Sequence, residues 1–366
     1  MDQEQKTTAN KKYPGTIWGL TSFFNPKGHK HKADYYRIFK NNIQRQGLKL
    51  VTVECAIKGA PFVLKPDDAD ILIQVRSDSI LWHKERLLNI GFERLPSDCD
   101  KIVLADSDII FLDDDWLQKA CDMLENYECI KPFYQAIRLT KKTSNKILRE
   151  RKYYPSDEHY YKEVELNYNF NPEFRFNYSP VFAWVMRKEI FDGLGFYDRM
   201  VIGSGDTIMT AAFHNSSSPL KNSSPALDAD IIVWCNKINE RMTGRLAHQD
   251  GTILHLFHGK KKNRNYYHRN AVLEKYDFQP HDDIKLNADK CWEWATPKKE
   301  LHQELELYFL SRNENDNFVA GQIIKYRNLK RKIKEKIIPR MIGLIGIAIK
   351  FLSPKLYRYL KINFKF

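Results

Sequence analysis

The sequence has 366 residues, of which 43% are hydrophobic and 13% aromatic, so it can bury a large core and is not a chain that is disordered throughout. Its six cysteines lie far apart with no CxxC pair, which excludes a zinc ribbon and predicts reduced thiols in a cytoplasmic setting. Most of the net charge of +13 lies from Lys325 onward, where 13 Lys and Arg residues accompany one acid, Glu335, so the nearly neutral remainder argues against a nucleic-acid partner.

Strands and helices alternate along the first half of the chain. Short apolar, β-branched runs predict strands, and apolar residues three and four apart predict helices. The predicted strands are Thr16–Phe23, Leu48–Cys55, Asp70–Val75, Lys101–Ala105 and a run that begins at Cys129, CIKPFYQAI. The predicted helices are Ala33–Gln46, stopped by Gly47, then Trp82–Phe92, and Trp116–Asn126, which one of Asp113 to Asp115 is expected to cap. This alternation predicts an α/β fold with a mostly parallel sheet.

Three segments lack such a pattern. Thr140–Phe174 is polar and weakly patterned, which predicts a long loop or insertion, and His214–Pro225 predicts a second loop. The first 14 residues are polar, which predicts a flexible amino terminus without a secretory leader. No run reaches the roughly 18 uninterrupted apolar residues that a membrane-spanning helix needs.

Asp106 and Asp108 directly follow the predicted strand Lys101–Ala105. Residues two apart on extended backbone face the same side, about 7 Å from each other. Two such carboxylates can flank Mg²⁺ or Mn²⁺ and the diphosphate that the cation neutralises, although a solvated turn is the alternative for so short a motif. Ligands of parallel sheets bind beyond the carboxyl ends of the strands, where Glu54 and Asn25 also fall, so this position favours the cation site.

The segment VIGSGDTIM places Asp206 after two glycines. Gly203 and Gly205 would let the backbone approach a ligand closely. Asp206 then opens an apolar helical pattern, so it is either the cap of that helix or a general base in a glycine-lined pocket.

Three features nearer the carboxyl end also have a functional and a structural interpretation. His255 and His258 end a strand, and a histidine there could complete the coordination of a cation held by carboxylates, or be merely packed. The basic run at 260–264 could neutralise phosphates, or be a solvated loop. Trp292 and Trp294 could stack on a sugar, or pack in the core.

Taken in order, these motifs resemble glycosyltransferases of the GT-A fold. The stretch WHKERLLNIGFERLPSDCDKIVLADSDIIF is similar to the β-1,4-galactosyltransferase pattern, in which a basic helix and Asn-Xaa-Gly-Phe precede a strand and a DxD motif. The stretch YSPVFAWVMRKEIFDGLGFYDRMVIGSGD resembles the next block of that family and of family-2-like bacterial and viral transferases. HLFHGKKKNRNY resembles the strand with the metal-binding histidine.

The resemblance implies a GT-A, Rossmann-like sheet and a metal-dependent, inverting transfer. A hexose or N-acetylhexosamine would move from a nucleotide sugar, with UDP as the nucleotide, to a glycan or lipid-linked acceptor. Asp206 would be the base, and Mn²⁺ or Mg²⁺ would be held by Asp108 and His258, with Asp106 and His255 as further candidates. The implied donor-binding residues are Asn25, Glu54, Arg76, Lys84, Asp106 and Lys260. The implied acceptor-binding residues are Trp184, Gly203, Gly205, Trp292 and Trp294.

The sequence also departs from the galactosyltransferase pattern. Only Asp206 remains of the acidic cluster after the glycines, and the tryptophan motif before that cluster is absent, so donor and acceptor identity do not transfer. A GT-A-like nucleotidyltransferase is one alternative, but FFNPKGHKHK only faintly resembles the glycine-rich basic loop that it would carry. A non-catalytic carbohydrate-binding protein is another, although it would not need Asp108, His258 and Asp206 together.

The predicted organisation is a flexible terminus at 1–14, a transferase domain at 15–320 and a basic tail at 321–366. Within the domain, 15–135 would bind the nucleotide sugar and 136–320 the acceptor and metal. The tail has an apolar centre that Lys350 interrupts, with basic residues on both sides. This make-up is typical of an amphipathic helix lying on an anionic membrane, which predicts a peripheral protein at the cytoplasmic face. The alternative is a helix that packs on protein.

Overall fold

The computed structural model describes residues 15–150, 161–166, 182–216, 223–259 and 269–312, together with 340–341, 344, 347 and 350–354 near the carboxyl end. The chain forms two compact units, which are described separately. The first comprises Met1–His258 and Asn265–Arg312, and the second comprises Gly259–Arg264 and Asn313–Phe366. The predicted flexible terminus at 1–14 and most of the predicted tail lie outside the described residues.

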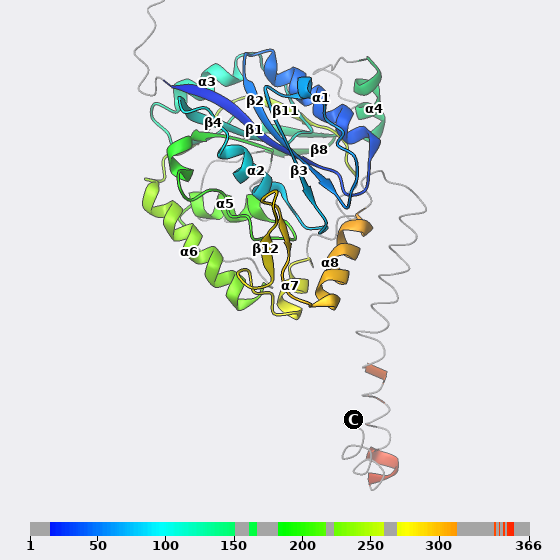
Figure 1. The fold of residues 1–366 in the computed structure, drawn as a ribbon. Helices are drawn as coiled ribbons and strands as arrows, with labels where there is room; N and C mark the ends of the chain where they lie inside the picture. Colours follow the sequence, from blue (N-terminus) through cyan, green and yellow to red (C-terminus); the bar gives the residue numbers. More distant parts are fainter. Residues whose placement is uncertain are drawn as a thin grey trace, which may run out of the picture. The chain divides into compact units, whose positions relative to one another are not determined.

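The first unit is built on a seven-stranded sheet with the strand order β10-β6-β9-β4-β1-β2-β3 (Figure 1). Its strands are β1 (Thr16–Phe24), β2 (Lys49–Ile57), β3 (Ile71–Ser77), β4 (Cys99–Ala105), β6 (Cys129–Lys131), β9 (Ala183–Arg187) and β10 (Leu246–His248). The pairs β1–β2, β1–β4, β2–β3 and β6–β10 are parallel, and β9 runs antiparallel to both of its neighbours. The predicted α/β fold with a mostly parallel sheet is therefore confirmed.

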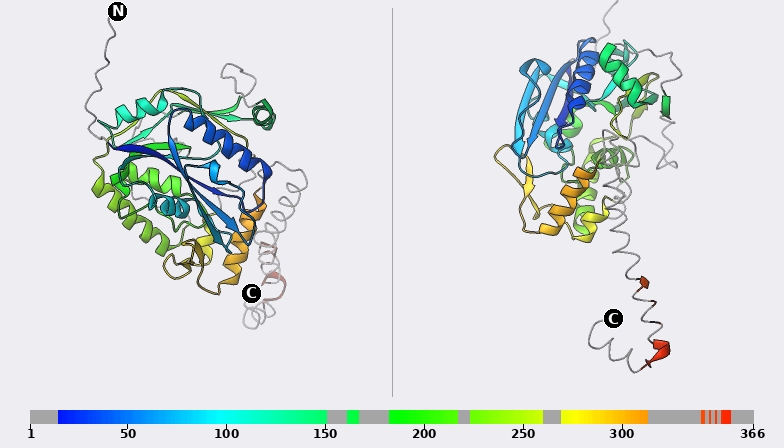
Figure 2. Two further views of the ribbon diagram at one scale, coloured as in Figure 1. Left: turned by 45° about the horizontal axis from the view of Figure 1, so that its top comes forward. Right: turned by 90° about the vertical axis from the view of Figure 1, so that its right-hand side faces the viewer.

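Helices cover both faces of this sheet (Figure 2). Their bounds are α1 (Lys30–Gln44), α2 (Lys84–Phe92), α3 (Trp116–Met123), α5 (Gly205–Phe213), α6 (Pro225–Arg241), α7 (Ala271–Lys275) and α8 (Lys299–Ser311). One buried cluster joins the sheet to α2, α5, α6 and α8 through residues such as Leu88, Ile208 and Leu305. The other joins it to α1 and α3 through Phe39 and Trp116. These two clusters thus form a layer of core on each face of the sheet.

A second, smaller sheet has the order β5-β11-β7-β8. Its strands are β5 (Ile109–Phe111), β7 (Gln135–Leu139), β8 (Tyr161–Leu166) and β11 (Thr252–His255). Part of the predicted loop Thr140–Phe174 is therefore regular: it contains α4 (Lys141–Glu150) and β8. The predicted strand from Cys129 is also corrected, because Pro132 cannot donate a ladder hydrogen bond and the run divides into β6 and β7 in different sheets.

Two helix starts differ from the predictions. Asp115 occupies the position before α3, but its side chain makes no capping hydrogen bond and pairs with Lys119 at 2.8 Å instead. The sequence reading did not predict α6, although Ser224 accepts a hydrogen bond from the Leu227 N–H and Pro225 begins the helix, which is a common way to start one. The hairpin of β12 (Ile284–Leu286) and β13 (Trp292–Trp294) completes this unit.

The described residues of the second unit are helical at 340–341, 344, 347, 350–352 and 354. Their apolar members are widely exposed, from 55% for Met341 to 90% for Phe351. None of the helices in the described part of the chain is both long and apolar enough to cross a bilayer.

Candidate active site

The candidate site lies where strands of the large sheet reach their carboxyl ends. Asp106 directly follows β4, and Lys131 is the last residue of β6. The amino-terminal turns of α2 and α5 bring in Lys84 and Asp206. The structure thus gathers at one place charged residues that are up to 122 positions apart in the sequence.

Lys84 joins two of the predicted site residues. Its ammonium group donates to Asp106 Oδ1 at 2.7 Å and to Asp206 Oδ1 at 2.8 Å. Burial alone would lower the pKa of Lys84, but the two carboxylates outweigh it and hold that pKa well above the usual value. Burial raises the pKa of Asp206, Lys84 opposes this shift and Asp106 adds to it. Lys84 is therefore the group that favours an ionised Asp206.

Asp206 does not cap its helix. Ser204 is the N-cap residue of α5, with φ of +91°, and its side chain makes no capping bond; Ser204 Oγ accepts from Arg269 Nη2 at 2.6 Å. Asp206 lies in the first turn, where the helix dipole also favours a negative charge. The cap interpretation of Asp206 is wrong in this structure, and its carboxylate faces Lys84.

Asp106 is held by the backbone of Phe182 as well as by Lys84. The Phe182 N–H donates to Asp106 Oδ2 at 3.1 Å, and the Asp106 N–H donates to the Phe182 carbonyl at 2.7 Å. Phe182 has φ of +85°, a strained value for a bulky residue that typically occurs at functional sites. Its ring lies 4.9 Å from that of His255, so one residue connects Asp106 to the histidines.

Asp108, His255 and His258 form the group of the described residues that could hold a metal ion, with ligand atoms that all lie within 4.8 Å of one another. Asp108 Oδ2 is 2.5 Å from His258 Nδ1, and Asp108 Oδ1 is 3.4 Å from His255 Nε2. One carboxylate and two imidazoles form a mixed oxygen and nitrogen set, which suits Mn²⁺ better than Mg²⁺. The residues present therefore fit a divalent cation.

The two histidines are not equivalent. Arg138 Nη1 lies 3.0 Å from His255 Nδ1, and because a guanidinium only donates, this nitrogen accepts and the ring proton belongs on Nε2, facing Asp108. A protonated Nε2 cannot ligate a metal. The arrangement favours His258 as the ligand and His255 as the residue that orients Asp108, a second layer of contacts common around metal sites.

Helices α1 and α4 enclose this cluster. Ser144 Oγ accepts from the Phe257 N–H at 2.9 Å, and Tyr35 hydrogen-bonds the same serine. Burial raises the pKa of Tyr35 to about 12, and the nearby Asp108 adds to that shift. Tyr35 therefore keeps its hydroxyl proton at physiological pH and stays a neutral hydrogen-bonding partner of Ser144 beside the cluster.

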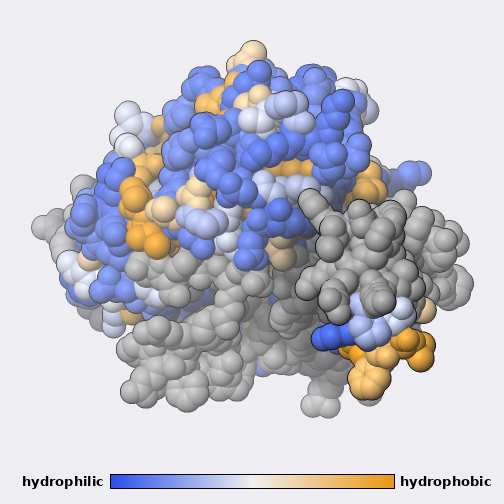
Figure 3. All heavy atoms as spheres, turned by 90° about the horizontal axis from the view of Figure 1, so that it is seen from below, coloured by the Kyte–Doolittle hydropathy of each residue, from blue (hydrophilic) through white to orange (hydrophobic). Residues whose placement is uncertain are grey.

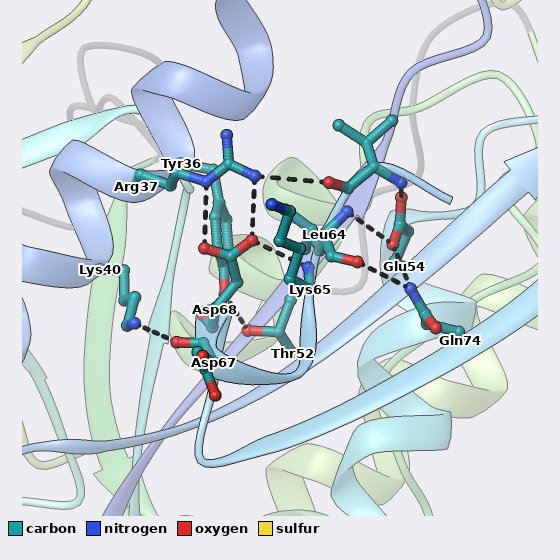
Figure 4. A network of polar contacts seen from close by, with 11 residues as sticks. Tyr36, Arg37, Lys40, Thr52, Glu54, Leu64, Lys65, Asp67, Asp68 and Gln74 are labelled. Atoms are coloured by element: carbon teal, nitrogen blue, oxygen red, sulfur yellow. Dashed lines mark hydrogen bonds and ion pairs between the residues drawn. The ribbon is translucent and has the colours of Figure 1, made fainter. Parts of the chain in front are cut away.

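The predicted donor-binding residues lie along the ends of β1, β2 and β3. Asn25 exchanges two hydrogen bonds of 2.9 Å with the backbone of His29, which shapes the connection between β1 and α1. Glu54 is buried, and its carboxylate accepts from the backbone N–H groups of Val63 and Leu64 and from Gln74 (Figure 4). In this structure Glu54 supports the loop after β2.

Arg76 is the exposed member of that set. Its guanidinium lies 4.2 Å from the centre of the Phe62 ring, and its backbone N–H donates to Asp289 at 2.8 Å. The planar cation stacked on an aromatic ring makes a platform of the kind that can hold a nucleobase. Lys260 lies outside the described residues.

The predicted acceptor-binding tryptophans occupy two places. Trp184 is buried on β9, and the Lys131 ammonium lies 4.5 Å from the centre of its ring. Its side chain therefore packs in the core behind Lys131. Trp292 and Trp294 lie on β13, and their backbones contact the end of β3 and the residues that follow it. The Trp292 carbonyl accepts from Ser77 Oγ, and the Trp294 N–H donates to Ser79 Oγ. These contacts place the two tryptophans beside the strand that carries Arg76.

The sequence reading missed Lys131, Glu85 and Arg138. Lys131 is 2% exposed and, after Lys84 and Asp106, also influences the pKa of Asp206, which it lowers. Glu85 had a detectable signal: it lies three residues before Leu88 and so shares an apolar face of α2, where a carboxyl group is unusual. Nothing in the sequence marked Arg138, because its role depends on the pairing of β7 with β11.

No protein-family profile and no curated protein sequence matches the chain. The solved structures similar to it include S. aureus TarS 1-349 in complex with UDP-GlcNAc, at 11% identity and a TM-score of 0.37, over 91% of this chain and 80% of that one. They also include M. tuberculosis glucosyl-3-phosphoglycerate synthase in complex with Mg²⁺ and UDP, at 11% identity and a TM-score of 0.33, over 67% and 73%. A third is the 4-diphosphocytidyl-2C-methyl-D-erythritol synthase of Anaerococcus prevotii, at 11% and 0.28, over 65% and 87%. Identity and TM-score are low throughout, so function has to be inferred from the geometry of the site.

Proposed function

We propose that the protein is a metal-dependent, inverting glycosyltransferase that moves a hexose or N-acetylhexosamine from a UDP-sugar to a glycan or lipid-linked acceptor. The observation that carries this proposal is the contact between two groups of residues. Asp108 and His258, with His255 beside them, could hold a cation, and Phe182 connects this group to Lys84, Asp106 and Asp206. A site that only bound sugar would need neither the metal ligands nor a buried ion-paired base.

Different residues of the site would act on the departing diphosphate and on the acceptor hydroxyl. A divalent cation held by Asp108 and His258 would neutralise charge on the departing diphosphate. Asp206 would accept the proton of the acceptor hydroxyl as it attacks the anomeric carbon. Lys84 opposes the rise in the pKa of Asp206 that burial causes, and so favours the ionised form that this role needs. A single displacement by the acceptor inverts the anomeric configuration and needs no carboxylate nucleophile.

The donor would extend along the strand ends. Arg76, stacked on Phe62, supports a proposal of nucleobase binding at the end of β3. Asn25 and Glu54 would act through the loops that they support. Asp106, held by Lys84 and Phe182, would face the ribose or the cation.

The described residues of the tail support the proposed membrane partner. Met341, Leu344, Ile347 and Phe351 follow one another at intervals of three and four, so they share one face of a helix, and all four are exposed. By contrast, hydrophilic residues cover much of the described surface that Figure 3 shows. An exposed apolar stripe within a basic segment fits insertion into an anionic lipid surface, at the cytoplasmic face.

The test is a donor assay with a panel of nucleotide sugars, with and without Mn²⁺. Wild type should release nucleotide diphosphate from one donor class only when Mn²⁺ is present. Asp108→Asn should keep the fold and lower turnover by about 100-fold or more, since the diphosphate loses its counter-charge. Asp122→Asn, a change on the exposed surface of α3, is the matched control. Turnover that is unchanged by EDTA would contradict the proposal.

A further inference from the structure

Glu85 is a buried carboxyl group beside the proposed base. It lies in the first turn of α2 and is 7% exposed, and the Trp82 side chain is close enough to its carboxyl group to lower its pKa by hydrogen bonding. A Cβ atom at Gly205 would overlap the Glu85 carboxyl group. Gly205 lies in ordinary helical backbone, so this close approach, and not a backbone requirement, explains a glycine one residue before Asp206.

Two charges act directly on Glu85: that of Lys84, which precedes it on α2, and that of Asp206, which lies in α5. Asp106, which follows β4, and Lys131, which ends β6, act in turn on Asp206. The closest cation, Lys84, already donates to Asp106 and Asp206. Glu85 therefore competes for a lysine that two other carboxylates occupy.

Burial is the main reason that the pKa of Glu85 is raised to about 8, and the charge of Asp206 raises it further while Lys84 opposes the shift. Below that pH Glu85 carries a proton, and above it Glu85 becomes a third negative charge in the pocket. An unpaired buried carboxylate is costly, so ionisation of Glu85 would draw Lys84 away or force a proton onto Asp206.

We propose, on the basis of the function proposed above, that Glu85 is the second carboxyl group of the acceptor end, a positioning residue that stays neutral while Asp206 acts as the base. Neutral Glu85 leaves Lys84 bridging Asp106 and Asp206, and ionised Glu85 breaks that bridge. The enzyme should therefore work below the pH at which Glu85 ionises and fail above it.

The first experiment is the pH dependence of turnover for wild type, Glu85→Gln and Glu300→Gln, an exposed change on α8 as control. Wild type and Glu300→Gln should lose activity above about pH 8, by about tenfold for each further pH unit. Glu85→Gln mimics the neutral acid, so it should keep its turnover at pH 7 within about threefold and show no fall between pH 8 and 9. The same alkaline fall in Glu85→Gln would overturn the proposal.

The second experiment needs no activity and no folded Glu85 variant. Infrared difference spectra of the full chain between pH 6.5 and 9.5 should show a protonated carboxyl band that disappears near pH 8. In Asp206→Asn, which removes the neighbouring negative charge, the band should disappear at lower pH. Absence of any such band overturns the inference even if transfer is observed. A titrating band in a protein that transfers no sugar supports the paired carboxyls and contradicts only the proposed glycosyltransferase.

Discussion

Lys84 is the residue on which the proposed chemistry most depends. Its side chain is 13% exposed, and it donates to two carboxylates at 2.7 and 2.8 Å. A cation in such a place can be stable only because both partners are ionised. The same contact also acts on Asp206, because the Lys84 charge lowers the pKa of that carboxyl group while burial, the larger effect, raises it.

Asp206→Ala tests the role of that carboxylate. We expect transfer to fall by about 10²- to 10⁴-fold, the usual contribution of a general base. Nucleotide-sugar binding, measured by calorimetry with Mn²⁺ present, should change little because the donor contacts lie at Asp108 and the strand ends. If donor binding disappears and transfer only follows it, Asp206 is structural and some other group is the base.

At the scale of elements, Asp68 connects helix α1 to the segment between β2 and β3. Its carboxylate accepts from Arg37 Nε at 3.1 Å, from Arg37 Nη2 at 3.0 Å and from the Lys65 N–H at 2.9 Å. Its carbonyl accepts from the Tyr36 hydroxyl at 2.6 Å (Figure 4). Burial would raise the pKa of Asp68, but Arg37 and the Lys65 N–H outweigh it and lower that pKa.

Asp68→Asn should therefore destabilise the protein in a pH-dependent way. A lowered pKa means that the stabilisation is present above the unfolded-state pKa of about 4 and is lost as the pH falls through the folded-state value. At pH 7 we expect the variant to lose about 1 kcal/mol of unfolding free energy, because Arg37 is partly exposed and solvent weakens the pair. Urea unfolding at pH 7 and pH 3 measures this, with Asp67→Asn as the neighbouring control. An equal loss at both pH values would contradict the ionic explanation.

For the whole molecule, the charge distribution separates the two proposed roles. Nearly all of the net charge of +13 lies from Lys325 onward, outside the first unit, while the proposed chemistry lies within it. A basic tail with an apolar face strengthens the binding of a protein to an anionic membrane. The binding free energy improves by roughly 1 kcal/mol for each basic residue near the surface. The proposed acceptor is therefore expected at that surface.

The full chain should sediment with anionic liposomes at low salt, and high salt should release part of it because screening weakens the attraction. A chain truncated after Ile324 should stay in the supernatant and still use the donor with a soluble acceptor. Neutral liposomes are the control. Failure of the full chain to bind anionic liposomes, or unfolding of the truncated chain, would show that the tail is structural.

The sequence by itself determined the parts of this protein that local chemistry decides. Alternating apolar runs and helical spacing gave the elements around Lys84–Phe92 and Cys99–Ala105, since each depends on residues a few positions apart. The DxD motif could be placed at a strand end for the same reason. The sheet order of the parallel strands agrees with the predicted fold class.

Only the tertiary structure decided which residues work together. Pro132 interrupts the run after Cys129, but which sheet each half joins, and the pairing of β8 within Thr140–Phe174, depend on partner strands distant in sequence. The proton on His255 follows from Arg138, 117 positions away. The protonation of Glu85 follows from its burial and from its packing against the turn that carries Asp206. Burial and charge between distant segments are properties of the folded chain, so no local pattern in the sequence could reveal them.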